Sequence, residues 1–499
     1  AGITCPVVFS VRDGVYDGQV LLSNITGNSI ANSISFVGES GDSSLVTLRY
    51  NTSNSILDYA LKLENVKGIT FRDIGIERSS NSVAMSMVNC DSVYMNGIYL
   101  NGGTQLRVED ANKLTVFGSN LGSSEISFIN KNDSVYLLNN IGNRDWWSYV
   151  VSCQDIDSVL NVFNFSGNSF VGALQLGNWN GGGHVYNGLI SYNNFNSGQY
   201  HIFSYTSNLT IDTNFFNSDG SILLFLRRAT NLSFTRNSLQ GSNYLSNYNC
   251  NVQFRGAWDN VLIRDNTFNN ALDLGLDLGN PGSGGLTIDK NTFSLSNGYS
   301  DNGEVGAICI RHYSRDNGAY NYFSGHIKNV VITDNDISTT VSSNSGFHAI
   351  LVSGANGSSG NIIRGNTISE GMSPIYASYV DSIVENRLAG AENTTGIKLA
   401  DGPSVIANNY ITLSGLGTSK GISLASGCSN SKVLFNSINN TGTNSSSSIC
   451  LETSGSLTGL VVKNNIFGST GGGMPISVGT ALSGHDWDYN CYYSPNGNV

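Results

Sequence analysis

A short phrase recurs along this chain: two alternating apolar residues, a polar step, and then Asn-x-Φ, where Φ is Phe, Ile or Leu. Clear copies are VLIRDNTF (261–268), LTIDKNTF (286–293) and LVVKNNIF (460–467). Thirteen copies run from Asn139 to Asn465, so twelve steps cover 326 residues, a mean of about 27, which is a solenoid period. The aligned asparagines are Asn139, Asn168, Asn193, Asn214, Asn237, Asn266, Asn291, Asn335, Asn366, Asn386, Asn409, Asn436 and Asn465.

This period has a direct structural interpretation. Short strands with alternating apolar residues send every second side chain into a core, and stacked coils bring equivalent residues into columns about 4.8 Å apart. An Asn at the same turn of every coil can then hydrogen-bond to the Asn above and below. We therefore predict an all-β chain, a right-handed single-stranded parallel β-helix (solenoid) of about 20 coils, with a structural Asn ladder.

A second strand in each coil is predicted from triplets of the form Φ-x-Φ, roughly twelve to fifteen residues before each Asn. The middle residue of each triplet should face outward, so this column should form a flat, solvent-facing sheet suited to a long ligand. The triplets are LKL (61–63), MSM (85–87), LRV (106–108), LQL (174–176), IKL (397–399), ISL (422–424), ICL (449–451) and ISV (476–478).

One interval between the aligned asparagines is much longer than the mean. The step from Asn291 to Asn335 is 44 residues long, so it holds an insertion or an extra short coil near 295–325. The inserted residues are rich in Tyr, Gly, Asp and Asn. Insertions on one face of a solenoid often form its binding face.

Composition agrees with an all-β fold and excludes several partners. Charged residues make up only 12% of the chain, and the net charge of −11 is not offset by any basic block. Nucleic acid is therefore not expected as a partner. No run of 18 or more apolar residues occurs, so no membrane span is expected. The eight cysteines are scattered, without metal-ligand spacing. We expect mostly free, buried thiols, with Cys428–Cys450 as the best disulfide candidate.

Both ends of the chain carry longer phrases. The start reads GITCPVVFSVRDGVYDGQVLL, followed by NSISFVGESGDSSLVTLRY, and the end reads DWDYNCYYSPNGNV. These phrases resemble the opening and closing segments of large secreted β-helix proteins of the Bacteroidetes that use type IX secretion. Cys5 stands where that family has Gly. The resemblance implies an extracellular, cell-surface setting, a role as an adhesin or polysaccharide-associated module, and no established catalytic motif.

The resemblance also suggests how the chain is organised. Residues 1–50 would be an N-terminal cap segment and residues 51–485 the coils. Residues 486–499 would continue into a longer chain, so flanking domains of the same polypeptide are expected partners.

Candidate ligand-binding residues concentrate in the middle coils. Outward Arg, Asp and Gln side chains near several tryptophans are typical of a glycan groove, because aromatic rings stack on sugar faces while charged groups bind hydroxyls or carboxylates. The alternative is an Arg–Asp ladder on a solvated sheet, with the tryptophans packing loops over the coils. The predicted glycan-binding residues are Arg227, Gln253, Arg255, Trp258, Asp273, Asp277, Trp146, Trp147 and Trp179.

Catalysis is left open by these residues. Asp273 and Asp277 would lie about 13 Å apart on one strand, beyond the roughly 5–9.5 Å of a glycoside hydrolase pair. A polysaccharide lyase is more plausible, since it needs a cation to neutralise a uronate carboxylate and a base to take the C5 proton. Arg255 or Arg311 would supply the cation and His312 or Tyr313 the base, with Asp273 as a further candidate.

No cofactor is required by this interpretation. The alternating oxygens of Asp486, Asp488 and Asn490 are candidate ligands for Ca²⁺. We therefore predict an extracellular β-helix module that presents an extended surface for adhesion or recognition of a polysaccharide or cell-surface glycan. A polysaccharide-degrading enzyme, with a lyase favoured over a hydrolase, is one alternative. A structural spacer or self-associating filament subunit is the other.

Overall fold

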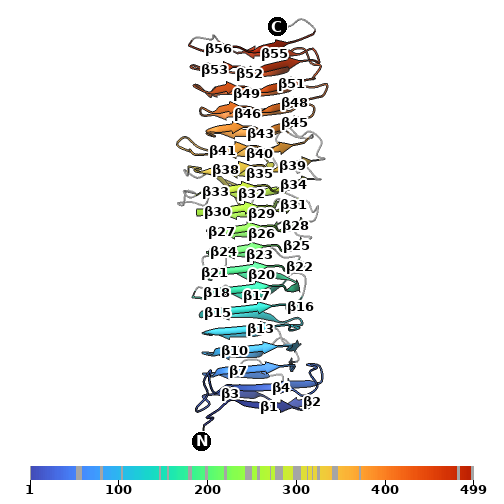
Figure 1. The fold of residues 1–499 in the computed structure, drawn as a ribbon, viewed down its shortest axis with the longest axis vertical. Helices are drawn as coiled ribbons and strands as arrows, with labels where there is room; N and C mark the ends of the chain where they lie inside the picture. The colour runs from blue at the N-terminus through green and yellow to red at the C-terminus, as the bar shows by residue number, and fades with distance from the viewer. Residues whose placement is uncertain are drawn as a thin grey trace. The chain divides into compact units, whose positions relative to one another are not determined.

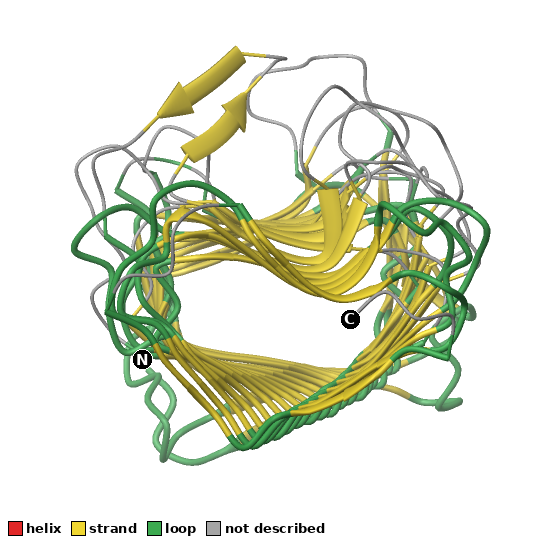
Figure 2. Cartoon of the chain, turned by 90° about the horizontal axis from the view of Figure 1, so that it is seen from above, coloured by secondary structure: helices red, strands yellow, loops and turns green. Residues whose placement is uncertain are grey.

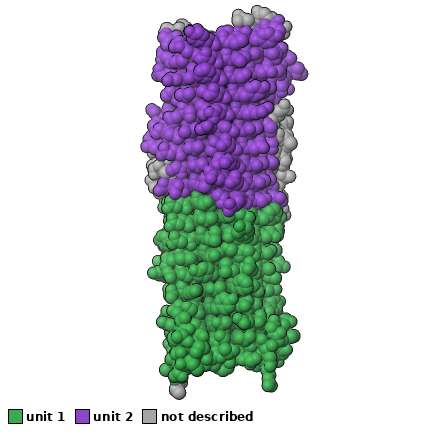
Figure 3. Space-filling view, viewed as in Figure 1, with its two compact units in different colours: residues 1–233 green, residues 234–499 purple. Residues whose placement is uncertain are grey.

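The computed structural model shows two compact units, residues 1–233 and 234–499 (Figure 3). Each unit is a parallel β-solenoid of stacked coils (Figure 1). The described residues contain strands and turns and no helix, so none of them forms a helix able to cross a membrane. The structure describes residues 2–51, 59–78, 83–102, 105–144, 148–153, 155, 157–177, 182–196, 201–218, 222–241, 250–255, 259–269, 271–275, 285–295, 305–311, 313–316, 319–322, 326–339, 347–369, 373–479 and 484–495.

Most coils contribute one strand to each of three sheets, which we name A, B and C in the order in which the chain visits them. In unit 1, sheet A contains β1 (Val7–Val11), β4 (Ile34–Gly38), β7 (Lys67–Arg72), β10 (Asp91–Asn96), β13 (Lys113–Phe117), β15 (Lys131–Leu138), β18 (Val159–Ser166), β21 (His184–Ser191) and β24 (Ser207–Asp212). In unit 2 it contains β30 (Asp259–Arg264), β33 (Leu286–Asp289), β38 (Val330–Thr333), β41 (Ile362–Arg364), β44 (Ser382–Val384), β47 (Val405–Ala407), β50 (Lys432–Leu434), β53 (Val461–Lys463) and β56 (Asp486–Asp488). Strand β27 (Thr230–Thr235) includes residues of both units.

Sheet B follows sheet A in every coil except that of β13, where Asn120 forms only isolated bridges, so its strands form two groups, of four and of fourteen. In unit 1 it contains β2 (Gly14–Asp17), β5 (Val46–Tyr50), β8 (Gly75–Arg78), β11 (Tyr99–Asn101), β16 (Ile141–Asn143), β19 (Ser169–Val171), β22 (Asn194–Asn196) and β25 (Phe215–Ser218). In unit 2 it contains β28 (Ser238–Gly241), β31 (Thr267–Phe268), β34 (Thr292–Leu295), β39 (Asp336–Thr339), β42 (Thr367–Ile368), β45 (Arg387–Gly390), β48 (Tyr410–Leu413), β51 (Ser437–Asn440), β54 (Ile466–Ser469) and β57 (Cys491–Tyr493).

Sheet C closes each coil. In unit 1 it contains β3 (Val20–Ser23), β6 (Leu61–Glu64), β9 (Val83–Val88), β12 (Gln105–Glu109), β14 (Glu125–Ile129), β17 (Tyr149–Cys153), β20 (Ala173–Leu176), β23 (His201–Ser204) and β26 (Ile222–Arg227). In unit 2 it contains β29 (Cys250–Arg255), β32 (Ala271–Gly275), β35 (Val305–Arg311), β40 (Phe347–Ser353), β43 (Ser373–Ser378), β46 (Thr395–Asp401), β49 (Ser419–Gly427), β52 (Ser448–Thr453) and β55 (Met474–Val478).

The core forms from the inward residues of these strands. Val93, Leu114, Val135 and Phe163 lie in register on four successive strands of sheet A, and each is at most 2% exposed. Burying one such side chain contributes roughly 1.5–3 kcal/mol. The alternation read from the sequence therefore becomes a column of buried residues. Sheet A, whose strands begin the coils, contains nineteen strands among the described residues, slightly fewer than the twenty coils predicted.

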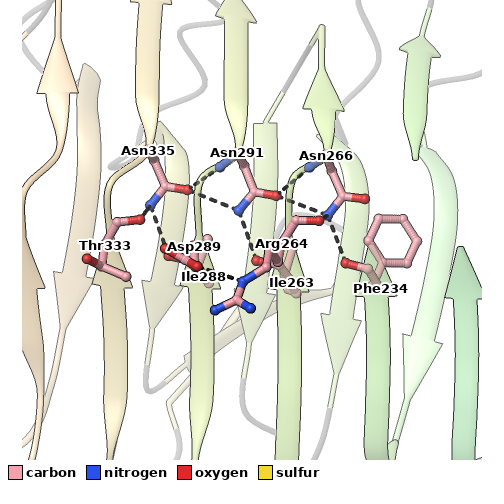
Figure 4. Close-up of polar contacts among 9 residues, drawn as sticks. All are labelled: Phe234, Ile263, Arg264, Asn266, Ile288, Asp289, Asn291, Thr333 and Asn335. Atoms are coloured by element: carbon pink, nitrogen blue, oxygen red, sulfur yellow. Dashed lines mark hydrogen bonds and ion pairs between the residues drawn. The ribbon is translucent and has the colours of Figure 1, made fainter. Parts of the chain in front are cut away.

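The Asn ladder lies at the tight corner between sheets A and B. Oδ1 of Asn291 accepts hydrogen bonds from the backbone N–H and the side chain of Asn266, both at 3.0 Å. Nδ2 of Asn291 donates to Asn335 Oδ1 at 3.0 Å and to the Ile263 carbonyl at 2.9 Å (Figure 4). The amide is therefore fully bonded inside the protein, which offsets the cost of burying it. The predicted structural role of these asparagines is confirmed.

The ladder differs from the prediction at one position, where Asn140 replaces Asn139. Asn140 is buried and donates to Asn168 Oδ1 from its backbone N–H, at 2.8 Å, and from Nδ2, at 3.1 Å. Asn139 is exposed and left-handed, with φ of 55°, and Gly167 holds the same position one coil on, with φ of 69°. The pairing of Leu138 with Ser166 forces this register. The alignment favoured Asn139 because Ile141 matches Φ two residues later, but Ile141 pairs with Ser169 and is 53% exposed.

The triplets predicted for the second strand lie in sheet C, and one of them is out of frame. Ile422 of β49 pairs with Leu451 of β52, so the outward residue of that coil is Glu452. Cys450, the middle residue of the ICL triplet, is fully buried instead. The prediction that Cys450 faces outward is wrong because the pairing between coils, and not the local pattern, sets the frame.

The proposed disulfide is also absent. Cys428 and Cys450 are both free thiols. Cys428 Sγ donates to the Leu399 carbonyl at 3.2 Å, while Cys450 Sγ donates to the Gly468 carbonyl, also at 3.2 Å. The two sulfurs therefore contact different parts of the coil. Cys90 and Cys153 are free and buried as predicted, whereas Cys5 and Cys491 are free but exposed.

The long interval between Asn291 and Asn335 contains an insertion and not an extra coil. Strand β33 pairs directly with β38, so a single coil separates the two asparagines. The extra residues include an antiparallel hairpin formed by β36 (Tyr313–Asp316) and β37 (Ala319–Tyr322). Figure 2 shows this hairpin on the outer side of sheet C.

Candidate functional site

The predicted site residues are partly brought together on sheet C of unit 2. Gln253 of β29 lies opposite Asp273 of β32, and Arg255 lies opposite Gly275. Arg311 of β35 also pairs with Gly275, so Arg255 and Arg311 are two coils apart in one row, about 9.6 Å. The Arg311 side chain is only 8% exposed. This burial makes Arg311 a poor first contact for a ligand.

Several other predicted positions cannot be placed. Arg227 ends β26 of unit 1. The side chains of Arg227, Gln253, Arg255 and Asp273 lie outside the described residues, although their backbone is described. The following residues lie wholly outside the described part: Trp146, Trp147, Trp179, Trp258, Asp277 and His312.

The row that contains Asp273 continues along sheet C and carries polar residues that sequence reasoning did not single out. Successive pairings place Cys309, Leu351, Tyr376, Lys398, Ser423 and Glu452 at the same position of their strands. Cys309 and Leu351 are buried there, at 2% and 0% exposure, whereas the last four are not. We call the last four of these residues the outer row. The signal for Lys398 was present in the IKL triplet, whose middle residue was predicted to face outward. Tyr376 was missed because its strand reads IYA, without a second large apolar residue.

An aromatic residue and a cation meet at the start of the outer row. Lys398 Nζ lies 5.1 Å from the centroid of the Tyr376 ring, within the range of a cation–π contact. The centroid of the His348 ring, from β40, lies 5.0 Å from the centroid of the same Tyr376 ring. Lys398 is exposed and Tyr376 half-buried. The pair therefore offers a solvent-facing ammonium group beside an aromatic surface.

His348 is neutral at physiological pH. Its side chain is only 6% exposed, and burial, followed by the charge of Lys398, lowers its pKa to about 4. Among the described residues, Nδ1 of His348 has no hydrogen-bond partner. The neutral imidazole thus retains an unused polar atom beside Tyr376. The sequence offered only an isolated histidine here, because His348 and Tyr376 come from different coils.

The far end of the outer row is an ion-paired carboxylate. Glu452 Oε2 accepts hydrogen bonds from Lys420 Nζ at 2.7 Å and from Ser423 Oγ at 2.9 Å. Lys420 and Glu452 are 28% and 20% exposed at their side chains, so the pair contributes little to stability but holds both groups in place. The outer row therefore presents a ring, a cation, a hydroxyl group and a carboxylate on successive coils.

The residues considered for calcium have other contacts. Asn490 is the last rung of the ladder and accepts from Asn465 Nδ2 at 2.9 Å. Asp486 is ion-paired with Lys463 at 2.5 Å, and Asp488 accepts the Tyr489 N–H. Within the described chain, no group of three or more His, Cys, Asp or Glu residues is placed to hold a metal ion. Calcium binding stays a prediction.

Comparison with known proteins does not assign a family. No family model matches the chain. No curated protein matches it either. Among solved structures, PfbA, a surface adhesin of Streptococcus pneumoniae, is 12% identical, with a TM-score of 0.21, over 91% of this chain and 83% of its own.

Two further solved structures are similar over most of their length. A variant of the PL6-family alginate lyase AlyGC is 9% identical, with a TM-score of 0.17, over 97% of each chain. The A-module of the mannuronan C-5 epimerase AlgE6 of Azotobacter vinelandii is also 9% identical, with a TM-score of 0.15, over 98% of this chain and 91% of its own. At these values the likenesses carry no functional argument.

Proposed function

We propose that this protein is an extracellular β-solenoid module that recognises an extended acidic glycan along the outer row of unit 2. The observation that supports the proposal is the row itself, in which Tyr376, Lys398, Ser423 and Glu452 repeat at about 4.8 Å. A glycan laid along the coils would meet an aromatic face, a cation for its carboxylate, and hydrogen-bonding groups for its hydroxyls.

The cellular setting is part of the same proposal. The phrases at both ends of the chain resemble secreted Bacteroidetes β-helix proteins of the type IX secretion pathway, which supports a cell-surface location. Polysaccharide or cell-surface glycan would be the partner, together with flanking domains of the same polypeptide. Adhesion would follow from binding glycan on another surface.

The test is binding of labelled uronate-containing and neutral oligosaccharides to the whole chain and to point variants. We expect Lys398→Ala to weaken binding of the acidic glycan about tenfold, since a hydrogen bond to a charged group contributes roughly 1.5 kcal/mol. The loss should shrink as salt rises. Lys432→Ala is the matched control, because Lys432 is an exposed lysine of the same unit but lies on sheet A.

Two results would overturn this proposal. One is an absence of acidic-glycan binding by correctly folded protein. The other is binding that survives both Lys398→Ala and Tyr376→Ala. Tyr376→Phe keeps the ring and should retain most of the affinity.

A polysaccharide lyase is a second candidate, favoured by the neutral His348 beside Tyr376. In that reaction Lys398 would stabilise the uronate carboxylate, and His348, which is only 6% exposed, would take the C5 proton after the ring of Tyr376 moved aside. The C5 electron pair would form the C4–C5 double bond, and the O4 leaving group would depart with a proton from Tyr376. Incubation with uronate polysaccharides should then produce the ultraviolet absorbance of the unsaturated product. Glycan binding without that absorbance would leave recognition as the function.

A further inference from the structure

A second surface, on sheet A of unit 1, differs in chemistry from the outer row. Outward residues of β10, β13 and β15 lie in register: Tyr94, Thr115 and Tyr136 form one line, and Asn96, Phe117 and Leu138 form the next. We call these six residues the aromatic band. The pairing of the three strands is continuous, so the six side chains stand on an even lattice about 4.8 Å by 6.7 Å.

The aromatic band is uncharged and exposes its rings. Phe117 is 37% exposed, and Tyr94 and Tyr136 are half-buried. Within the described chain, neither tyrosine hydroxyl makes a hydrogen bond to the protein. Charged residues lie at the margin of the band: Arg72 pairs with Asn96, Lys113 precedes Thr115 by two residues, and the Asp73 N–H donates to the Asn96 carbonyl at 3.0 Å. Although the protein has a net charge of −11, none of the six residues of the band carries a positive or a negative charge.

The three rings are spaced for a periodic ligand. Tyr94 and Tyr136 are two coils apart, about 9.6 Å, and Phe117 lies between them in the neighbouring line. Side chains of Thr115 and Asn96 supply hydroxyl and amide groups beside the rings. Stacking on ring faces with hydrogen bonds at the edges is how proteins hold sugar rings.

The size of the band argues against a second protein copy as its occupant. Three coils and two outward positions cover about 200 Å², from the lattice spacings of a sheet. A stable protein interface needs roughly 800 Å² on each partner. The band is too small for such an interface, and four of its six residues are Tyr, Thr or Asn, with hydrogen-bonding groups available to a hydroxyl-rich ligand.

We propose that the aromatic band binds an uncharged polysaccharide that runs along the coils of unit 1, with its pyranose rings stacked on Tyr94, Phe117 and Tyr136. This site is separate from the outer row of unit 2 and does not depend on it. A chain that carries both would attach to a neutral polymer through one surface and to an acidic glycan through the other.

The experiment measures retention of the whole chain on insoluble cellulose and on chitin, at low and high salt. We expect retention that salt does not weaken, because no charge pair is involved. Tyr136→Ala should reduce the affinity about tenfold, and the pair Tyr94→Ala with Tyr136→Ala should abolish retention. Tyr410→Ala is the matched control, since Tyr410 is 47% exposed but lies on sheet B of unit 2.

The remaining outcomes separate the two proposals. Lys398→Ala should leave retention on cellulose or chitin unchanged, whereas Tyr136→Ala should leave acidic-glycan binding unchanged. Retention of the double tyrosine variant at the parental level would overturn the proposal, as would a lack of retention on both polymers. A dimer in solution that Tyr136→Ala dissociates would also overturn it, because the band would then bind a second copy.

Discussion

Asn139 and Asn140 are neighbours in one turn, so replacing each of them with alanine tests the ladder with almost identical chemistry in the two variants. Asn140→Ala removes three side-chain hydrogen bonds: from Ser119 N–H to Oδ1 at 2.9 Å, and from Nδ2 to the Val116 carbonyl at 3.0 Å and to Asn168 Oδ1 at 3.1 Å. The Ser119 N–H is left without that acceptor in a buried site. At about 1 kcal/mol for each bond, the expected cost is about 3 kcal/mol.

Asn139→Ala should cost at most about 1 kcal/mol. Asn139 is exposed and left-handed, and alanine tolerates that conformation somewhat less well than asparagine. The two variants should therefore differ by about 2 kcal/mol, which is more than tenfold in an opening equilibrium. The difference arises only from which of two neighbouring amides faces the corner of the coil.

Hydrogen exchange at single amides is the appropriate assay, because solenoid coils depend mainly on their neighbours and global unfolding need not be two-state. In Asn140→Ala the Ser119 amide should exchange about a hundredfold faster, while in Asn139→Ala it should stay protected. Urea unfolding of both variants gives the total free-energy change. Equal losses in the two variants, or a larger loss in Asn139→Ala, would refute the register described above.

Three further results are expected. Burial lowers the pKa of His348 to about 4 from an ordinary 6.5, so the unfolded state binds more protons than the folded state between these pH values. The free energy of unfolding should therefore fall by about 2–3 kcal/mol as the pH drops from 7 to 4.5. Urea unfolding of His348→Gln should lack that part of the loss. Burial raises the pKa of the Cys428 and Cys450 thiols to about 12. A thiol reagent should therefore label the exposed Cys5 and Cys491 rapidly, but Cys428 and Cys450 only after denaturation. Peptide mass spectrometry would measure the labelling of each cysteine. Glu452→Gln should cost no more than about 1 kcal/mol in unfolding free energy, because its partly exposed ion pair with Lys420 is worth little; a larger loss would mean that the pair organises the coil.

The candidate site was recoverable from the sequence only in part. The IKL triplet identified Lys398 as outward-facing, because alternation along a strand is a local property. Nothing local connects Lys398 with Tyr376 or His348, since each comes from a different coil and the intervening loops vary in length. Their grouping depends on which residues pair between β40, β43 and β46.

The repeat of Asn and alternating apolar residues determined the parallel solenoid, its buried columns and its ladder. Those features follow from strand geometry and from the cost of burying an amide without partners, both of which act on every coil alike. Only the tertiary structure decided that Asn140 and not Asn139 is the rung, that Cys450 faces inward, and that residues 313–322 contain a hairpin. A shift of one residue leaves the local pattern plausible but reverses every side chain of a strand, so the packing of neighbouring coils selects the register.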